Sequence, residues 1–395
     1  QIMCQVAQRM GWGAAFDFNS PAEVFAEYVA LSTATQDIKR DLDLSVFVDT
    51  DYASLLPQQW PHNGKRFFAD GQFYHPDGKA KMLPIVAPDP VQSDGFSLNT
   101  GRNRDQWHTM SRTGKAPRLG AHLAEPYAEI HPEDAAQLTV TTGDLLELSN
   151  GFGTSILRSL VTDRTAKRQI FAPMHWTRQQ SSAGWINNLA KPVVDPFSGQ
   201  PASKRNHVSA QKYEAAWFGY GVSVFQMPPH AEYAAVAQTL TGWQGEFAGK
   251  TVPHDWEALA ATLLSIPPNT VASMRDINSQ QTRIAFHDGD QLIGLFFAGP
   301  EPLSLARSYL VSLIGTTTPA LKALAGRSGT DQPDPGAIVC ACHSVGANTL
   351  RRAIDVGASS VEELGEITCA GTNCGSCKPE LENLLKSARR PMAAE

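Results

Sequence analysis

The sequence lacks several features that would assign it to a class directly. No apolar run approaches the length that spans a bilayer, and no basic segment with an apolar core opens the chain as a secretory signal does. The formal net charge of -6 does not favour a general nucleic-acid binder. No G-x-x-x-x-G-K motif or Ser-His-Asp arrangement offers independent chemistry. We therefore expect a cytoplasmic protein that binds neither membranes nor nucleic acid.

The length and the start of the chain indicate a piece of a larger architecture. A chain of 395 residues, 42% hydrophobic and 18% charged, has room for two or three domains with their own cores. It opens with QIMCQVAQRMG, which has no initiator Met and already follows a helical apolar pattern. We expect the C-terminal part of a longer polypeptide.

The first strong helix signal lies in NSPAEVFAEYVALS. Ser20 can cap the helix, Pro21 suits its first position, and Glu23 completes a capping box. An apolar stripe follows and predicts a helix packed on a core; it consists of Val24, Phe25, Tyr28 and Leu31.

Two further regions differ in pattern. From 96 to 214 the strands are short, with a hairpin signal around Asn150-Gly151 and a short helix starting at Pro132, which predicts a closed barrel. From 215 to 325 two helical patterns flank a hairpin signal around Asp288-Gly289, which predicts an α+β unit. A Gly-, Pro- and Ser-rich linker follows at 326–337. The expected fold class is α+β and multidomain.

Five of the six cysteines lie near the C-terminus. Cys340 and Cys342 form a C-x-C pair, and Cys374 and Cys377 form a C-x-x-C pair. Two short helices are predicted between the pairs: one starts near 348 and ends at 357, and the other follows a capping box at 360 and 363. Cys369, outside the pairs, is expected to be a small buried residue, and Cys4 a packed helical one.

Two close pairs of thiols predict a metal site or two disulfides. A cytosolic setting disfavours disulfides. Zinc takes four thiolates readily, but usually through two C-x-x-C knuckles. An iron–sulfur cluster is the favoured interpretation, and the other two stay open.

A basic stretch, TGRNRDQWHTMSRTGKAPRL, lies in the predicted barrel. Its cations accompany a single acid, Asp105; they are Arg102, Arg104, Arg112, Lys115 and Arg118. A solvated loop is one interpretation, and single-stranded nucleic acid another, although the lone Trp107 offers no stacking platform. A phosphate or pyrophosphate ligand is the third, because Thr100-Gly101-Arg102 combines N–H, hydroxyl and guanidinium donors.

Both motif regions resemble known families. CAC…AGTNCGSC resembles the [2Fe-2S] module of bacterioferritin-associated ferredoxins, which is also appended to assimilatory nitrate and nitrite reductases. TGRNRDQWHTM, EPYAEIHPEDAAQL, GDLLELSNGFG and INNLAKPVVDPFSGQPASKRNHV resemble the molybdopterin-dinucleotide-binding domain of bacterial molybdenum reductases. Within that superfamily, the first of these is most similar to cytoplasmic assimilatory nitrate reductases.

The resemblance implies an arrangement of domains and sites. Residues 1–95 would end the catalytic region, 96–214 form a double-psi β-barrel, 215–325 a spacer, 326–337 a linker, and 338–390 a small helical [2Fe-2S] domain. The cluster ligands would be Cys340, Cys342, Cys374 and Cys377. The implied dinucleotide contacts are Thr100, Gly101, Arg102, Trp107, His108, Thr109, His175, Asn187, Asn188 and Lys204.

The implied activity is reduction of nitrate to nitrite. The implied cofactors are molybdenum bis(molybdopterin guanine dinucleotide), a [2Fe-2S] cluster and, in a missing upstream part, a [4Fe-4S] cluster. The donor would be a flavoprotein or ferredoxin, and no catalytic residue is assigned within this chain. A formate dehydrogenase-like oxidoreductase is one alternative; a stand-alone, non-enzymatic electron-transfer and cofactor-binding module is the other.

Overall fold

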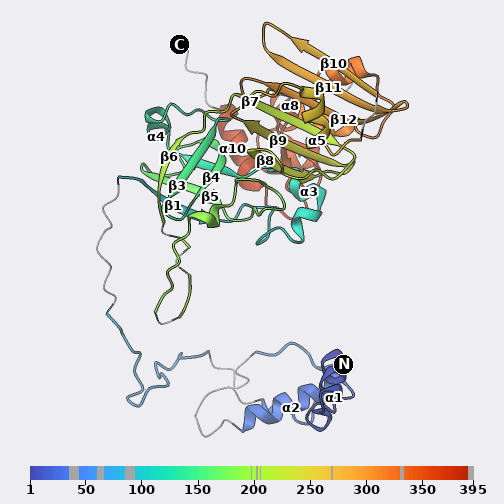
Figure 1. Cartoon of the computed structure of the whole chain (residues 1–395). Coiled ribbons are helices and arrows are strands. Elements are labelled where there is room, and N and C mark those ends of the chain that lie inside the picture. The colour runs from blue at the N-terminus through green and yellow to red at the C-terminus, as the bar shows by residue number, and fades with distance from the viewer. Residues whose placement is uncertain are drawn as a thin grey trace. The chain divides into compact units, whose positions relative to one another are not determined.

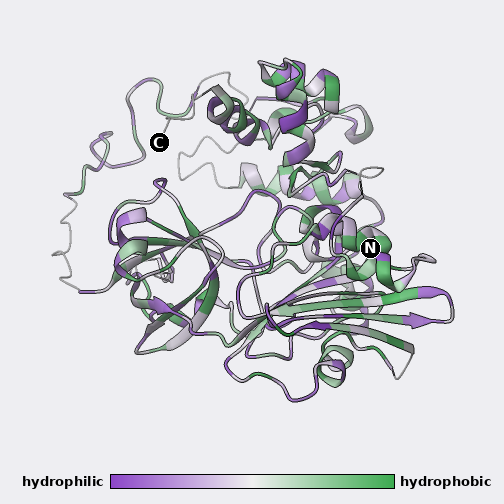
Figure 2. Ribbon diagram, turned by 90° about the horizontal axis from the view of Figure 1, so that it is seen from above, coloured by the Kyte–Doolittle hydropathy of each residue, from purple (hydrophilic) through white to green (hydrophobic). Residues whose placement is uncertain are grey.

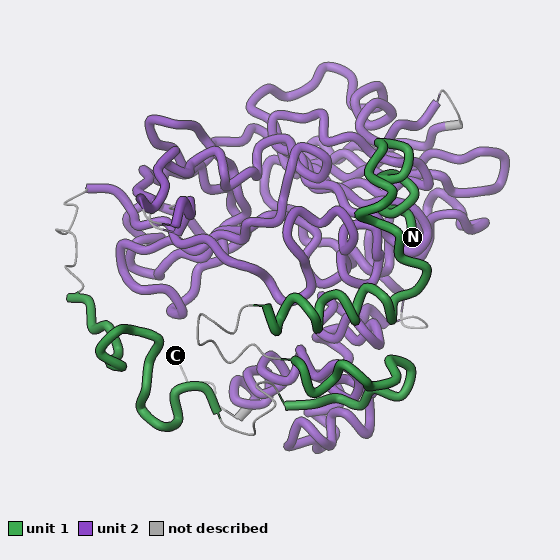
Figure 3. Tube along the Cα trace, turned by 90° about the horizontal axis from the view of Figure 1, so that it is seen from below, with its two compact units in different colours: residues 1–91 green, residues 92–395 purple. Residues whose placement is uncertain are grey.

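The structure is a computed structural model. It describes residues 1–34, 44–59, 66–84, 94–196, 198–201, 203–204, 206–267, 270–329 and 333–389. The chain divides into two compact units, residues 1–91 and 92–395 (Figures 1 and 3). No helix among the described residues is both long and apolar enough to cross a membrane.

The described residues of unit 1 form two α-helices and three short 3-10 turns. The helices are α1 (Ile2–Arg9) and α2 (Pro21–Thr33); the turns are η1 (Gly13–Ala15), η3 (Ser45–Phe47) and η4 (Tyr52–Ser54). The predicted capping box forms, because the hydroxyl of Ser20 accepts the N–H of Glu23 and the Glu23 carboxylate accepts the N–H of Asn19. Both predicted helices are confirmed.

The predicted burial of the α2 stripe is wrong. Val24, Tyr28 and Leu31 are about half exposed. The helix instead buries Val29, and the ring of Phe25 lies 5.5 Å from that of Tyr52. A capping box fixes where a helix begins, but packing depends on partners far along the chain.

Unit 2 begins with a closed six-stranded barrel in the order β1-β5-β2-β4-β3-β6. Its strands are β1 (Phe96–Gly101), β2 (Tyr127–Ile130), β3 (Leu145–Asn150), β4 (Gly153–Val161), β5 (Gln169–Pro173) and β6 (Asn206–Lys212). Between them lie η5 (Thr113–Lys115), α3 (Pro117–Gly120), α4 (Pro132–Gln137) and η6 (Ile186–Leu189). The pairs β1/β5 and β2/β4 are parallel, whereas the other neighbours are antiparallel.

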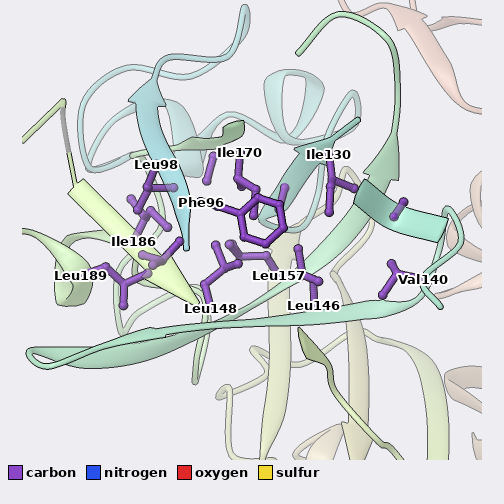
Figure 4. Packing of buried hydrophobic residues seen from close by; sticks show 14 residues of the cluster. Phe96, Leu98, Ile130, Val140, Leu146, Leu148, Leu157, Ile170, Ile186 and Leu189 are labelled. Atoms are coloured by element: carbon purple, nitrogen blue, oxygen red, sulfur yellow. The ribbon is translucent and has the colours of Figure 1, made fainter. Parts of the chain in front are cut away.

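The barrel interior is filled by aliphatic side chains around Phe96 (Figure 4). Leu98, Leu157 and Ile170 are fully buried there. The predicted hairpin is confirmed: Asn150 pairs with Gly153, and the Asn150 side-chain oxygen accepts the N–H groups of Phe152 and Gly153. The packed interior leaves cofactor contacts to the loops at the barrel ends.

An antiparallel six-stranded sheet follows in the order β10-β11-β12-β7-β9-β8. Its strands are β7 (Trp217–Ser223), β8 (Tyr233–Gln238), β9 (Trp243–Gly249), β10 (Thr270–Asp276), β11 (Gln281–Asp288) and β12 (Gln291–Gly299). Its helices are α5 (Trp256–Leu263), α6 (Arg307–Leu313) and α7 (Ala320–Leu324). The predicted helices and the hairpin at Asp288-Gly289 are confirmed.

Both faces of this sheet are covered, which explains its continuous apolar strands. Phe296 on β12 packs into the cluster around α5, whereas its neighbours Leu295 and Phe297 pack into the cluster around α6 and α7. Successive side chains of a strand point to opposite faces, so a sheet covered on both faces needs apolar residues throughout. In Figure 2, green marks the hydrophobic residues along these strands.

The C-terminal part, here called the cysteine module (338–390), has a small core of its own. A two-stranded ladder, β13 (Ile338–Cys340) and β14 (Val345–Gly346), precedes α8 (Ala347–Asp355), α9 (Val361–Thr368) and α10 (Lys378–Arg389). The cap predicted at 360 and 363 forms, because Ser360 accepts the N–H of Glu363. The core of the module brings the two cysteine segments together.

Candidate cofactor-binding sites

The four paired cysteines lie at the ends of elements that meet. Cys340 ends β13 and Cys342 lies in the following turn, while Cys374 lies after α9 and Cys377 just before α10. Gly371 and Gly375 have positive φ angles of 82° and 72°, which allow the tight turns expected of this loop. The two sequence pairs therefore face one another across the module.

The thiols interact as two cross-pairs. The sulfur atoms of Cys342 and Cys374 lie 3.4 Å apart. Burial, with the neighbouring thiol of Cys340, raises the pKa of Cys377 to about 11. The Ser376 hydroxyl lies 3.0 Å from the Cys374 sulfur and lowers the pKa of that thiol. One pair is buried and the other is partly accessible to solvent.

This arrangement fits a [2Fe-2S] cluster. All four thiols are free, and each iron of such a cluster takes two cysteine ligands. Among the described residues, no three His, Cys, Asp or Glu side chains are grouped around one ion position.

The remaining cysteines differ from the four. Cys369 was expected to be buried, but it is exposed, because it ends α9 in a left-handed conformation with φ of 64°. That turn directs the following Ala370 into the core. Cys4 lies in α1 and is partly buried.

The candidate dinucleotide loop, residues 102–110, begins directly after β1. β1 and β5 run in parallel with Gly101 opposite Pro173, so the segments after both strands leave the barrel at the same edge. Packing explains the glycine at position 101, since a Cβ there would lie 2.6 Å from the Phe171 ring. The register places residues 102–110 beside His175.

His175 is fully buried and holds this loop from within. Its Nε2 accepts the N–H of Asn103 at 2.9 Å, so its Nδ1 donates to the His108 carbonyl at 2.7 Å. Burial lowers the pKa of His175, and the nearby Arg102 lowers it further. Both ring nitrogens of His175 are therefore engaged with the backbone of the loop.

Exposed side chains of the loop form a polar and aromatic surface. The Arg102 guanidinium lies 5.6 Å from the centre of the Trp107 ring, and His108 meets that ring edge-on at 4.6 Å. Thr109 is exposed beside them. The structure therefore brings four of the predicted contacts to one accessible surface.

Thr100 and Lys204 also meet, although they are 104 positions apart. Lys204 Nζ donates to the Thr100 carbonyl at 2.5 Å, and the Thr100 hydroxyl donates to the Ser203 carbonyl at 3.0 Å. Asn187 and Asn188 lie elsewhere, on η6, where Asn188 donates to the Thr154 carbonyl of the β3–β4 hairpin. Ser203 and Lys204, which lie shortly before β6, thus contact the end of β1.

Two amides in the loop were not predicted as site residues. Asn103 and Gln106 are buried, yet both amide atoms of Asn103 and Oε1 of Gln106 lack a hydrogen-bond partner within the described protein. Buried polar atoms are almost always paired, so these atoms fit contact with a polar ligand. Their polarity beside the basic residues was the available signal.

A charged contact joins this loop to the cysteine module. Arg104 pairs with Asp105 and with Glu380 of α10, and His122 lies between the same two carboxylates. The sequence showed Arg104 only as one cation in a basic stretch. It gave no sign of His122 or Glu380 as partners, because 276 positions separate Arg104 from Glu380.

Comparison with known families agrees with this geometry. Residues 96–207 match the molybdopterin dinucleotide-binding domain, and residues 338–387 match the BFD-like [2Fe-2S] binding domain. These two regions belong to those families, so the chain carries two cofactor-binding domains.

The chain is homologous to nitrate reductases. It is 33% identical to the nitrate reductase of Klebsiella oxytoca over 97% of this chain and 45% of that protein. It is 27% identical to the assimilatory nitrate reductase catalytic subunit of Bacillus subtilis (52% of this chain, 29% of that protein). It is 26% identical to the F420-dependent formate dehydrogenase subunit alpha of Methanocaldococcus jannaschii (44% and 26%). The chain spans less than half the length of each.

Proposed function

We propose that the chain is the C-terminal portion of a molybdenum-dependent assimilatory nitrate reductase, which converts nitrate to nitrite in the cytoplasm. The observation that carries the proposal is the pair of sites in unit 2: paired free thiols in a module docked on the candidate dinucleotide loop. Homology to nitrate reductases over nearly the whole chain supports the substrate.

The proposed domains follow the predicted boundaries: 1–95 ends the catalytic region, 96–214 binds the dinucleotide, 215–325 is a spacer, 326–337 a linker and 338–390 the small helical [2Fe-2S] domain. We propose a double-psi barrel, which the two parallel strand pairs support.

Within the barrel, the loop residues and Lys204 would hold a dinucleotide of the bis(molybdopterin guanine dinucleotide) cofactor. Arg102 supplies charge for a pyrophosphate, and Trp107 supplies a flat apolar surface. Asn103 and Gln106 supply buried amides. His175 would position the loop, and Asn187 and Asn188 would contribute from the hairpin side.

Within the module, Cys340, Cys342, Cys374 and Cys377 would hold the [2Fe-2S] cluster, which exchanges one electron at a time. Burial of Cys340 and Cys377 shields one side, while Cys374 remains exposed toward a donor. We propose a flavoprotein or ferredoxin donor, and a [4Fe-4S] cluster in the part of the enzyme outside this chain.

Formate dehydrogenase-like chemistry is the second candidate, because a formate dehydrogenase subunit is also a relative. Expression of the complete reading frame that encodes this chain, with assay of nitrate and formate using an artificial dye, separates the two. Nitrate reduction supports the proposal, and formate oxidation alone overturns it. A start codon directly before Gln1 would favour a stand-alone electron-transfer module.

The cluster ligands are tested by substituting Cys374 with Ser, matched by Cys369→Ser five positions away. We expect Cys374→Ser to abolish the visible absorption of the reconstituted cluster and leave dinucleotide binding intact, because only the module loses a ligand. Cys369→Ser should keep full absorption. Full iron content in Cys374→Ser would contradict the assignment.

A further inference from the structure

Arg104 contacts both cysteine-bearing segments of the module. Its Nη2 donates to the Val339 carbonyl at 2.7 Å, and its Nη1 donates to the Glu380 carboxylate at 3.0 Å. Val339 directly precedes Cys340, and Glu380 lies three residues after Cys377. The Arg104 side chain of the dinucleotide loop therefore bridges the two chain segments that carry the proposed cluster cysteines.

The orientation of Arg104 is fixed from its own side of the contact. Asp105 accepts hydrogen bonds from Nε and Nη2 at 3.0 and 2.7 Å. His122 reinforces the contact: its Nδ1 lies 2.8 Å from a carboxylate oxygen of Asp105, and its Nε2 lies 3.4 Å from one of Glu380. The guanidinium is largely buried, so its charge is weakly screened.

The Arg104 charge also reaches the thiols. Arg104 and Cys377 are close enough to influence each other electrostatically. Reduction of a [2Fe-2S] cluster adds one negative charge beside this fixed cation, so the cation stabilises the reduced form more than the oxidised form.

We propose that Arg104 is a positioning residue for the cluster: it fixes the cysteine module on the dinucleotide loop, and its charge raises the reduction potential of the cluster. The second part rests on the proposed function, because it requires the cysteines to hold a cluster. Nothing in the family matches assigns Arg104, His122 or Glu380 to this contact.

The first experiment uses the whole chain with reconstituted cluster and the variants Arg104→Gln and Arg104→Lys. Arg351→Gln is the matched control, because Arg351 is an exposed arginine of α8 whose guanidinium donates to nearby Asn348. Iron content, midpoint potential and the rate of tryptic cleavage after exposed Arg327 in the linker are measured. Even an exposed site must extend to enter a protease, so we expect cleavage in the linker to speed up when the module is no longer held on the barrel.

We expect Arg104→Gln to keep its iron, to shift the midpoint potential to a more negative value, and to be cleaved about tenfold faster. Arg104→Lys should keep most of the potential, because the charge remains, but it should be cleaved at an intermediate rate, because the planar fork is lost. Arg351→Gln should match the wild type. Unchanged potential and unchanged cleavage in Arg104→Gln would overturn the proposal.

A second pair of variants leaves the dinucleotide loop unchanged, so that the test does not depend on correct folding of an altered loop. Glu380→Gln removes the partner on α10. Glu382→Gln, two positions along, is its control, because Glu382 is exposed and pairs with exposed Lys386 of the same helix. Glu380→Gln should also speed cleavage, but it should shift the potential in the opposite, positive direction, because it removes an anion. A shift of the same sign in both variants would overturn the charge mechanism.

The outcomes separate this proposal from the proposed function. If neither the wild-type chain nor any variant takes up iron, the cluster assignment fails. The proposed effect of the Arg104 charge on the reduction potential then fails with it, because there is no cluster to reduce. The cleavage comparison still decides whether Arg104 docks the module, because it needs no cluster.

Discussion

The barrel contacts both the antiparallel sheet and the cysteine module through an arginine that pairs with acidic residues. The two contacts have similar ion pairs but different surroundings. Toward the sheet, Arg158 forms a two-pronged pair with Glu125 at 3.0 Å and approaches Glu246 at 3.7 Å. Toward the cysteine module, Arg104 stands in the same way between Asp105 and Glu380. In each contact an arginine of the barrel links an acid of its own domain to an acid of the next.

The surroundings differ. The Arg158 guanidinium lies between the rings of Phe218 and Tyr233, at 5.9 and 5.6 Å, and an apolar cluster shared by barrel and sheet surrounds it. The core of the cysteine module contains residues of the module alone. We infer that apolar packing makes the first contact a permanent joint, while the second depends on charge and is easier to open.

The largest effect should come from removing the arginine of the barrel–sheet contact. Arg158→Ala leaves the partly buried Glu125 without its cation, and Glu246 keeps only its pairing with Arg307 at 2.5 Å. Burial already raises the pKa of Glu246. Loss of one member of a buried pair costs about 3–5 kcal/mol of unfolding free energy. Thermal unfolding followed by circular dichroism measures this loss.

Lys167→Ala is the control, because Lys167 and its partner Glu133 are both largely exposed and should contribute little. Equal unfolding temperatures for Arg158→Ala and Lys167→Ala would show that the buried network is not what joins barrel to sheet.

Tyr233→Phe should have a smaller effect on the same contact. Its fully buried hydroxyl donates to Glu125 at 2.7 Å, and a hydrogen bond to a charged group is worth about 1.5–3 kcal/mol. Tyr309→Phe is the matched control, since Tyr309 is a buried tyrosine whose hydroxyl forms no hydrogen bond to the residues that the structure describes. If both variants unfold at the same temperature, apolar packing alone holds the joint.

Sequence patterns located the parts of this molecule better than their contacts. The cysteine pairs, the hairpins and the caps at Ser20 and Ser360 were predicted, because each depends on residues a few positions apart. Burial of the α2 stripe was predicted wrongly, and Cys369 was expected inside, because burial depends on distant partners. The dinucleotide contacts stay a prediction, although the structure brings several of them together.

The contacts between domains had no local signal. Arg104 and Glu380 lie 276 positions apart, and Tyr233 and Glu125 lie 108 apart. A single sequence shows that such residues are charged or aromatic, but only the fold shows which of them meet. The contact of His175 with the His108 carbonyl could not be predicted for the same reason, because His108 lies 67 positions earlier in the chain.

The smallest predicted effect distinguishes the two contacts by pH. Burial alone would lower the pKa of His122, but the carboxylates of Asp105 and Glu380 outweigh burial and raise it above 6.5, against the opposing charge of Arg104. Because the folded pKa is the higher one, the stabilisation is complete below pH 6.5 and is lost as pH rises through the raised value. The described residues of the Arg158 contact include no histidine, so that contact lacks this source of pH dependence.

We therefore expect the wild-type module to be released more often from about pH 6.5 upward. Tryptic cleavage after Arg327 is measured at each pH and divided by the rate for His122→Gln, so that the pH dependence of the protease cancels. The ratio should be lowest at low pH, where the charged ring holds the module, and should approach one at high pH. A ratio independent of pH would show that His122 packs at this contact without carrying charge, and the difference between the two contacts would then rest on apolar packing alone.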